Sequence, residues 1–369
     1  MSKQGDNIYK RKDGRWEGRY VKGRTHGKTA FGYVFAATYT AAKKKLTTAK
    51  KMWKTGCEAM AQKNATLNAV SERWLEDSKS FLKESTIAKY RDYLSCYILP
   101  KFGEISVGEL STESVSSFFR MLLTEGGTGC KGLSARTVSE VRCILKILQK
   151  YAARQGCAVN FSLDGLCMKQ KEKPIRIFSE QEQERLRSYL SAALMPWHKG
   201  ILLCLFTGIR LGELCALRWD DICLSSKQLH IHRTMQRIRE AANAQTRTKI
   251  VITSPKSDCS IRTIPLPDKI CSSLRPFYRS GTFLLTGEQE RFIEPRTMQN
   301  RFKGVLEECG IADANFHALR HTFATRCVEA GFDAKCLSVI LGHSNVNITF
   351  NRYVHPTMEM KRRNMAKLQ

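Results

Sequence analysis

Hydrophobic residues recur every three or four positions along most of the chain, which is the spacing of an amphipathic α-helix. Four such series lie between residues 65 and 155, and Ser85, Ser111 and Ser134 are placed to cap three of the predicted helices. We expect Pro100 to end the second helix, because proline cannot donate the backbone hydrogen bond that would continue it. Four amphipathic helices predict a compact bundle with the apolar stripes at its core.

The first 63 residues show a different pattern. Residues 15–21 alternate between polar and apolar side chains as a β-strand does, after a turn signal at Asp13-Gly14, and residues 31–35 predict a second strand. Thr40 is then placed to cap a helix that runs to about Trp53. These segments predict a small sheet together with one helix.

A charged segment at residues 169–174, almost free of apolar residues and closed by a proline, predicts a linker. After it, Ser179-x-x-Glu182 is a capping box that opens a mostly helical part with one β interruption. The expected fold class is multidomain and mainly α with small β elements: an N-terminal small β-sheet plus helix, a central four-helix bundle and a C-terminal mixed, mostly helical domain. The predicted boundaries are 1–63, 64–168, 169–177 for the linker, and 178–369. The three β segments are predicted at 229–232, 250–253 and 261–264.

The charge of the chain indicates what kind of partner it binds. The chain has 61 Lys and Arg against 34 Asp and Glu, a formal net charge of +27, so we expect a polyanion, nucleic acid first. The alternative is a cationic surface that serves solubility. The first 63 residues hold sixteen basic against four acidic residues. Such a sheet, with aromatic residues interleaved, is suited to a DNA groove.

Six residues are candidate DNA contacts, three in the N-terminal unit and three in the helical unit. For the cations on helices, the alternative is an ordinary solvated charge. The candidates are Arg15, Trp16, Arg19, Lys83, Lys89 and Arg136.

Fourteen cysteines are scattered without a Cys-x-x-Cys pair, a spacing that predicts neither a zinc site nor a disulfide framework. Reduced thiols of this kind are typical of a cytosolic protein. No apolar segment follows the basic residues at the N-terminus, as a signal peptide would require. The apolar run at residues 201–206 is too short to span a bilayer. We therefore expect a cytoplasmic location and no membrane partner.

One candidate for anion binding is Arg210, which follows Thr207-Gly208 between two predicted helices. Glu213 lies three residues further on, within helical reach, and would orient the guanidinium for a bidentate contact with phosphate. An ordinary surface ion pair is the alternative interpretation.

A second candidate is the pair His317 and Arg320, which lie at i and i+3 so that one helix face presents both. We expect the adjacent His321 to point elsewhere. By itself, this spacing is common in helices.

Three further residues complete the set. His343 follows Leu341-Gly342, where a helix is predicted to stop, and Tyr353 lies ten residues beyond it. Lys256 lies in a predicted turn between two strands. Taken alone, these are more typical of a helix cap, a half-buried aromatic residue and a solvated turn lysine.

Taken together and in this order, these residues resemble the tyrosine recombinase (phage integrase) family. The resemblance covers residues 178–355, and the two preceding units look like that family's core-binding and arm-binding domains. The whole layout is similar to integrases of temperate phages and of integrative conjugative elements. The matching stretches are Thr207-Gly-Ile-Arg-Leu-Gly-Glu-Leu, Ser254-Pro-Lys, His317-Ala-Leu-Arg-His-Thr-Phe-Ala-Thr, Leu341-Gly-His-Ser and Thr349-Phe-Asn-Arg-Tyr-Val-His.

The resemblance implies a site-specific DNA recombinase that cleaves and rejoins strands through a 3′-phosphotyrosine intermediate, so as to integrate and excise a mobile element. It assigns Tyr353 as the nucleophile, and Arg210 and Arg320 as holders of the non-bridging phosphate oxygens. His343 would add a hydrogen bond to the same phosphate. A phenol becomes a useful nucleophile where cations stabilise the anionic transition state.

The remaining roles follow from the same resemblance. His317 would help to remove the tyrosine proton as general base, Lys256 would protonate the leaving 5′-oxygen, and Glu213 would brace the arginine. The sequence holds no carboxylate cluster or HExxH spacing for a metal and no nucleotide-binding glycine loop, so we expect no metal, ATP or other cofactor.

Expected partners are double-stranded DNA attachment sites and further copies of the chain in a homo-tetramer on DNA. Excisionase and DNA-bending host factors are candidate accessory proteins. The expected location is the nucleoid of a bacterial host. The basic tail, residues 358–369, would pack on a neighbouring subunit or stay idle. Two alternatives remain: a type IB topoisomerase-like enzyme, against which the basic N-terminal unit argues, and a non-catalytic DNA-binding relative.

Overall fold

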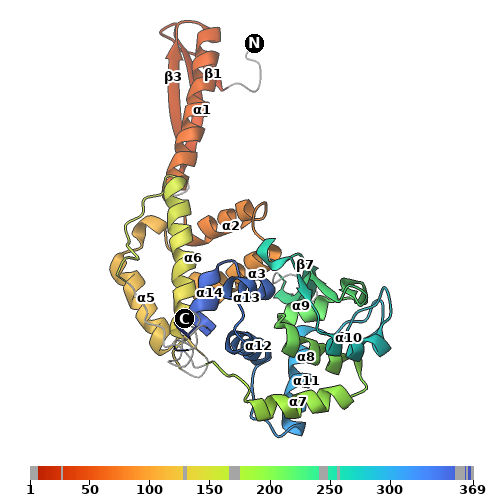
Figure 1. Cartoon of the computed structure of the whole chain (residues 1–369). Helices are drawn as coiled ribbons and strands as arrows, with labels where there is room; N and C mark the ends of the chain where they lie inside the picture. Colours follow the sequence, from red (N-terminus) through yellow and green to blue (C-terminus); the bar gives the residue numbers. More distant parts are fainter. Residues whose placement is uncertain are drawn as a thin grey trace. The chain divides into compact units, whose positions relative to one another are not determined.

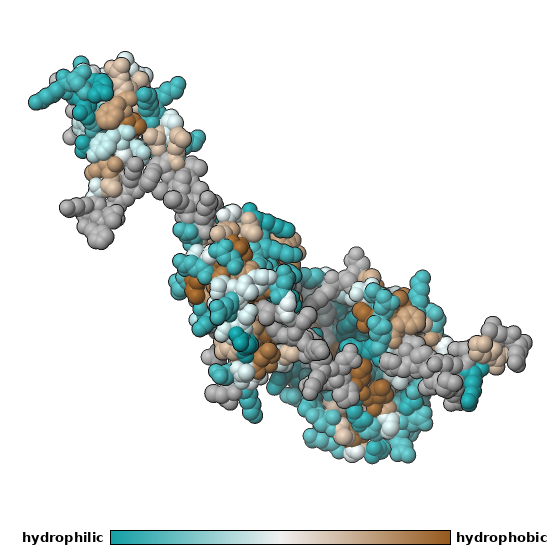
Figure 2. All heavy atoms as spheres, turned by 90° about the vertical axis from the view of Figure 1, so that its left-hand side faces the viewer, coloured by the Kyte–Doolittle hydropathy of each residue, from teal (hydrophilic) through white to brown (hydrophobic). Residues whose placement is uncertain are grey.

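The computed structural model describes residues 7–25, 28–127, 131–165, 175–240, 248–255, 258–353, 362 and 365–366. The chain divides into two compact units, Met1–Lys171 and Glu172–Gln369 (Figure 1). Helices predominate in the described ranges, and the strands form small antiparallel sheets, which confirms the expected fold class. Hydrophilic residues cover most of the visible surface, with smaller hydrophobic areas between them (Figure 2). None of the helices in the described ranges combines the length and apolar character that a membrane span requires.

The N-terminal segment forms a three-stranded antiparallel sheet of β1 (Ile8–Lys10), β2 (Trp16–Thr25) and β3 (Lys28–Ala36), followed by α1 (Tyr39–Lys63). The helix covers one face of the sheet, where Ile8, Ala42 and Leu46 are buried. Both predicted strands exist and are longer than expected. Strand β1 was not predicted, because three residues are too few to show a period.

The rest of the first unit is a helical bundle around a core that includes Phe102, Phe118 and Leu145. Ser111 and Ser134 cap their helices as predicted, since each hydroxyl accepts a hydrogen bond from the backbone N–H three residues on. The helices are α2 (Leu67–Ser78), α3 (Glu84–Tyr93), the π-helical η1 (Leu94–Ile98), α4 (Leu99–Phe102), η2 (Val107–Glu109), α5 (Thr112–Thr124) and α6 (Ala135–Arg154).

Two predictions for the second helix of this bundle are wrong. The helix begins at Glu84, with Lys83 rather than Ser85 at the cap position. Pro100 does not end it, because a π-helical turn leads into α4 and places the proline in that helix's first turn. A proline there costs little, since the N–H that it lacks would have no partner within that helix.

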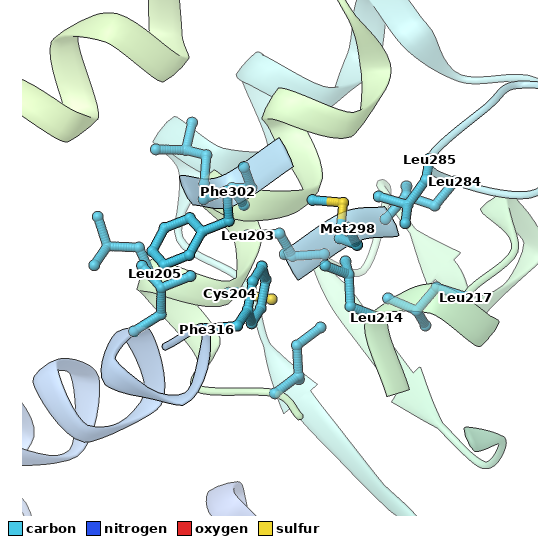
Figure 3. Packing of buried hydrophobic residues seen from close by; sticks show 14 of the residues in the cluster. Leu203, Cys204, Leu205, Leu214, Leu217, Leu284, Leu285, Met298, Phe302 and Phe316 are labelled. Atoms are coloured by element: carbon cyan, nitrogen blue, oxygen red, sulfur yellow. The ribbon is translucent and has the colours of Figure 1, made fainter. Parts of the chain in front are cut away.

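The second unit surrounds α8 (Pro196–Thr207), which is buried along nearly its whole length. Leu203 and Cys204 of α8 pack with Phe302 and Phe316 (Figure 3). The other helices are α7 (Glu180–Ala192), α9 (Leu211–Ala216), η4 (Trp219–Asp221), η5 (Asp258–Ser260), α10 (Asp268–Leu274), η6 (Arg275–Phe277), α11 (Pro295–Glu308), α12 (His317–Glu329), α13 (Ala334–Leu341) and α14 (Val346–Tyr353).

Two small sheets lie in the same unit. One has the order β4 (Ile222–Cys223), β5 (Gln228–Ile231), β8 (Arg262–Pro265), and the other pairs β6 (Thr234–Arg239) with β7 (Thr248–Thr253); all pairs are antiparallel. The three predicted β segments correspond to β5, β7 and β8. The capping box at Ser179 and Glu182 is also confirmed, with both reciprocal hydrogen bonds present.

Candidate active site

Arg210 lies at the junction of two helices. Helix α8 ends at Gly208, whose φ of 63° is left-handed, and Arg210 then takes the cap position of α9. Its backbone N–H donates to Oε2 of Glu213 at 2.9 Å and its Nη1 donates to Oε1 at 2.7 Å. Its Nη2 donates to the carbonyl of Gly342 at 2.8 Å. One carboxylate therefore caps the helix and fixes the guanidinium.

Glu213 has a second cation, Arg262, that sequence reasoning missed. Nη2 of Arg262 donates to Oε2 of Glu213 at 2.8 Å and Nη1 donates to Oε1 at 3.1 Å. Both side chains are only 2% exposed. Burial alone would raise the pKa of Glu213, but the hydrogen bonds and charge of Arg262, and then the charge of Arg210, hold that pKa below its usual value. Glu213 is therefore ionised and joins two arginines.

The alternation of side chains along β8 explains the position of Arg262. In β8, Arg262 and Ile264 are buried while their neighbours are exposed, so the arginine takes an inward-facing position. A charged residue at such a position requires a buried partner. Nε of Arg262 also donates to the carbonyl of Ile340 at 2.6 Å, near the C-terminal end of α13.

Arg320 is buried and fastened to two helix ends. Its Nη1 donates to the carbonyl of Gly208 and its Nη2 donates to the carbonyl of Leu341, both at 2.8 Å. Burial, and then the charge of Arg210, lower the pKa of Arg320, but a guanidinium remains protonated at neutral pH. Gly208 and Gly342 each end a helix with positive φ. These two turns bring Arg210 and Arg320 to one place.

Tyr353 is the last residue of α14 and is 6% exposed. Its hydroxyl lies 2.8 Å from Nδ1 of His321. The expectation that His321 points elsewhere is wrong. It lies one helical turn after His317 in α12, so the two share a face, and their rings meet nearly at right angles with centroids 4.6 Å apart.

His343 follows the end of α13 and faces the same helix as the tyrosine. Its ring is nearly parallel to that of Tyr353, with centroids 6.5 Å apart. Its Nδ1 lies 2.8 Å from the hydroxyl of Thr349, which is fully buried in α14. Helix α14 is therefore joined to the site by two histidines.

The electrostatics of the site keep the histidines neutral. Burial first, and then Arg352 and Arg320, lower the pKa of His321 to about 4. Burial and then Arg320 and Arg210 lower the pKa of His343 to about 3. Burial raises the pKa of Tyr353, while the charges of Arg320 and Arg352 oppose that rise.

His317 differs from the other two histidines because its side chain is exposed. Although the residue reaches the surface, the protein around the imidazole still desolvates it, and this, followed by the charges of His321 and Arg320, lowers its pKa below the usual value. At neutral pH the imidazole is therefore free to accept a proton.

The structure brings together six of the seven predicted residues within one unit. Lys256 lies outside the described residues. The six are Arg210, Glu213, His317, Arg320, His343 and Tyr353, and the structure adds Arg262, His321 and Thr349.

The N-terminal sheet has an exposed face opposite α1. Tyr9, Phe31 and Tyr33 are 53%, 38% and 50% exposed, and the guanidinium carbon of Arg19 lies 5.3–5.8 Å from each ring centroid. Arg15 lies near this face as well, 5.9 Å from the ring of Phe35. Arginine and aromatic residues thus share one open surface.

The other candidate DNA contacts have varied surroundings. Trp16 packs against Tyr39 beside the core beneath the sheet, with ring centroids 5.2 Å apart. In the bundle, Lys89 is paired with Glu140 at 2.8 Å, Arg136 is exposed and Lys83 is partly buried.

The sequence pattern of the Phage integrase family matches residues 176–360, half of the chain. The chain belongs to the phage integrase family. A second pattern, the N-terminal SAM-like domain of phage integrases, matches residues 66–122. The resemblance drawn from the motifs is thereby confirmed.

Two relatives illustrate the range of this family. The tyrosine recombinase XerC-like protein of Caldanaerobacter subterraneus is 27% identical over 330 residues, 81% of each chain. The transposase from transposon Tn916 of Enterococcus faecalis is 23% identical over 267 residues, 64% of each chain.

Solved structures share the fold. The Tn1549 transposon integrase in complex with transposon right end DNA has a TM-score of 0.65 at 20% identity, covering 82% of this chain and 99% of that one. The lambda integrase dimer bound to a COC′ core site has a TM-score of 0.58 at 15% identity, covering 96% of both chains.

Proposed function

We propose that the protein is a site-specific DNA recombinase that cleaves and rejoins strands through a 3′-phosphotyrosine intermediate, and that it integrates and excises a mobile element. The observation that carries this proposal is the setting of Tyr353. Its hydroxyl lies against a neutral histidine, in a site where Arg210 and Arg320 are fixed by helix ends and a buried carboxylate. Family membership supports the same reaction.

Arg210 and Arg320 hold the non-bridging oxygens of the scissile phosphate. The contacts described above use two side-chain N–H groups of each arginine, and a guanidinium has five, so both can also donate to phosphate. Phosphoryl transfer depends mainly on positioning and charge stabilisation, and two rigidly held guanidinium groups supply both.

His343 donates to the same phosphate. Because its Nδ1 faces the hydroxyl of Thr349, Nε2 is the nitrogen left for the DNA. His317 helps to remove the tyrosine proton, Lys256 protonates the leaving 5′-oxygen, and Glu213 braces Arg210. The phosphotyrosine bond keeps the energy of the broken phosphodiester. Closing the strand can therefore reverse these steps.

The domain roles belong to the same proposal. Residues 1–63 contact arm-type DNA sites with the exposed Arg15 and Arg19 face of the sheet, residues 64–168 contact the core site, and residues 178–369 perform the chemistry. Two attachment sites are bridged by a homo-tetramer, with excisionase and DNA-bending host factors as accessory partners. The Tn1549 and lambda integrases were each solved bound to DNA, lambda integrase also as a tetramer on a Holliday junction.

The test uses nicked suicide duplexes that span the two ends of the element carrying the gene. Cleavage releases a short fragment, so the covalent complex accumulates and is scored on a denaturing gel. We expect a complex with the wild-type protein on duplexes from the element ends and little on scrambled duplexes. Strong relaxation of a plasmid without such ends, and no recombinants, would instead support a topoisomerase.

A further inference from the structure

The proposed reaction requires a group that takes the proton of Tyr353, and the sequence motif gives that role to His317. In the structure, the imidazole in hydrogen-bond contact with the hydroxyl is that of His321, with 2.8 Å between Nδ1 and Oη. A general base must lie within about 2.6–3.2 Å of the atom that it deprotonates, or act through one water. His321 meets this requirement before DNA binds.

We propose that His321 is the direct proton acceptor of Tyr353, and that His317, whose ring packs against it, orients the imidazole. This assignment rests on the proposed recombinase function and concerns a residue to which the motif gives no role. For Nδ1 to accept, the ring proton must be on Nε2, which is the tautomer that a neutral imidazole with a phenol donor at Nδ1 adopts.

The charged and titratable groups around His321 favour a neutral imidazole in the free protein. Arg352 on α14 and Arg320 on α12 both repel a proton from the ring, and His317 and Tyr353 are its ring neighbours. Binding of a DNA phosphate adds a negative charge beside these cations. That charge raises the proton affinity of the imidazole when the phenol must be deprotonated.

The oxygen of Tyr353 forms a bond to phosphorus while its proton moves to Nδ1 of His321, and the bond between phosphorus and the 5′-oxygen breaks. The leaving 5′-oxygen takes a proton from the general acid, proposed above as Lys256. In rejoining, the 5′-hydroxyl returns its proton to the same general acid as its oxygen bonds to phosphorus. The bond between phosphorus and the oxygen of Tyr353 breaks, and His321 returns its proton to that oxygen.

The decisive variant is His321→Asn, which keeps a hydrogen-bonding group near the position of Nδ1 but cannot accept a proton. We expect DNA binding to stay within about twofold and covalent-complex formation on the nicked duplexes to slow by on the order of 100-fold. His230→Asn is the matched control, because His230 bonds to Thr263 in the sheet of β5 and β8. This control is expected to retain the wild-type rate.

A fluorinated tyrosine incorporated at position 353 separates deprotonation from a structural role. Fluorine lowers the pKa of the phenol, so a protein without its base gains more from the replacement than one with it. We expect the fluorinated residue to accelerate His321→Asn at least about tenfold more than it accelerates wild type. We expect His317→Asn to show a smaller loss and less rescue.

Three results would overturn the assignment. The first is a wild-type rate for His321→Asn. The second is a slow His321→Asn that fluorination does not rescue while His317→Asn is rescued, and the third is a faster His321→Asn, which would show that the contact restrains Tyr353. Failure of the recombinase function itself is distinguishable. In that case the wild-type protein forms no covalent complex on duplexes from either element end, and the role of His321 falls with it.

Discussion

Nδ1 of His343 and the hydroxyl of Thr349 lie 2.8 Å apart, which joins the turn after α13 to the helix that carries Tyr353. Thr349 is fully buried one helical turn before the tyrosine. The contact fixes the orientation of the imidazole. It also ties the position of Tyr353, the proposed nucleophile, to the position of His343, the proposed phosphate contact.

Replacing Thr349 with valine keeps the volume of the side chain and removes the hydroxyl. We expect Thr349→Val to slow covalent-complex formation about tenfold, because His343 loses its fixed orientation, while DNA affinity changes little. Single-turnover rates on the nicked duplexes and binding isotherms measure the two effects. Thr325→Val, on the neighbouring helix α12, is a control of the same chemistry. Equal rates for Thr349→Val and wild type would show that this contact does not contribute to covalent-complex formation.

The buried pair of Glu213 and Arg262 predicts a large effect on stability. Arg262→Met leaves a buried carboxylate with one cation instead of two, so we expect the free energy of unfolding to fall by about 3 kcal/mol. Arg291→Met removes an exposed ion pair with Glu288 and should cost less than about 1 kcal/mol. Denaturant unfolding followed by tryptophan fluorescence compares the two. Similar small losses would contradict the importance of the buried pair.

The pKa of Glu213 also predicts a pH dependence. Its pKa in the folded state lies below the usual 4.5, so the stability it contributes is complete above that value and is lost as the pH falls through the lower folded pKa. The difference in unfolding free energy between wild type and Glu213→Gln should therefore be constant near neutral pH and shrink in acid. A difference that grows on acidification would contradict the lowered pKa of Glu213 in the folded state.

The N-terminal sheet predicts a salt-dependent contribution to DNA binding. Arg15→Gln together with Arg19→Gln removes two cations from the exposed aromatic face. If each neutralises a phosphate, the slope of log K against log salt concentration should become less steep by roughly two on DNA that contains arm sites. On DNA with only the core site the slope should not change. An unchanged slope on both DNAs would show that this face of the sheet does not contact DNA.

Much of this architecture could be predicted because local rules and tertiary packing agree. Ser111, Ser134 and the Ser179 capping box mark helix starts that the structure keeps. The cap at Ser85 failed because the helix begins at Glu84, with Lys83 at the cap position. The stop at Pro100 failed because a π-helical turn carries the chain through the proline. Such a turn leaves no period in the sequence.

The geometry of the candidate site could be predicted only in part. Single residues such as Arg210, Arg320 and Tyr353 could be named from motif order. Their partners could not, because the contacts of Arg320 are backbone carbonyls at Gly208 and Leu341, and a carbonyl has no sequence signature. The prediction for His321 was wrong because residues at i and i+4 lie as close together on a helix face as residues at i and i+3, so His321 shares a face with His317.

The central claim is that the oxygen of Tyr353 becomes bonded to DNA, and mass spectrometry of the covalent complex tests it most directly. The complex is digested with nuclease and protease, and the modified peptide is sequenced, with Tyr353→Phe as the matched protein. We expect one modified residue, Tyr353, linked through a 3′-phosphate, a free 5′-hydroxyl on the released strand, and no adduct from Tyr353→Phe despite nearly unchanged DNA binding. A nucleotide on any other residue, a 5′-linkage, or an adduct from Tyr353→Phe would contradict the account.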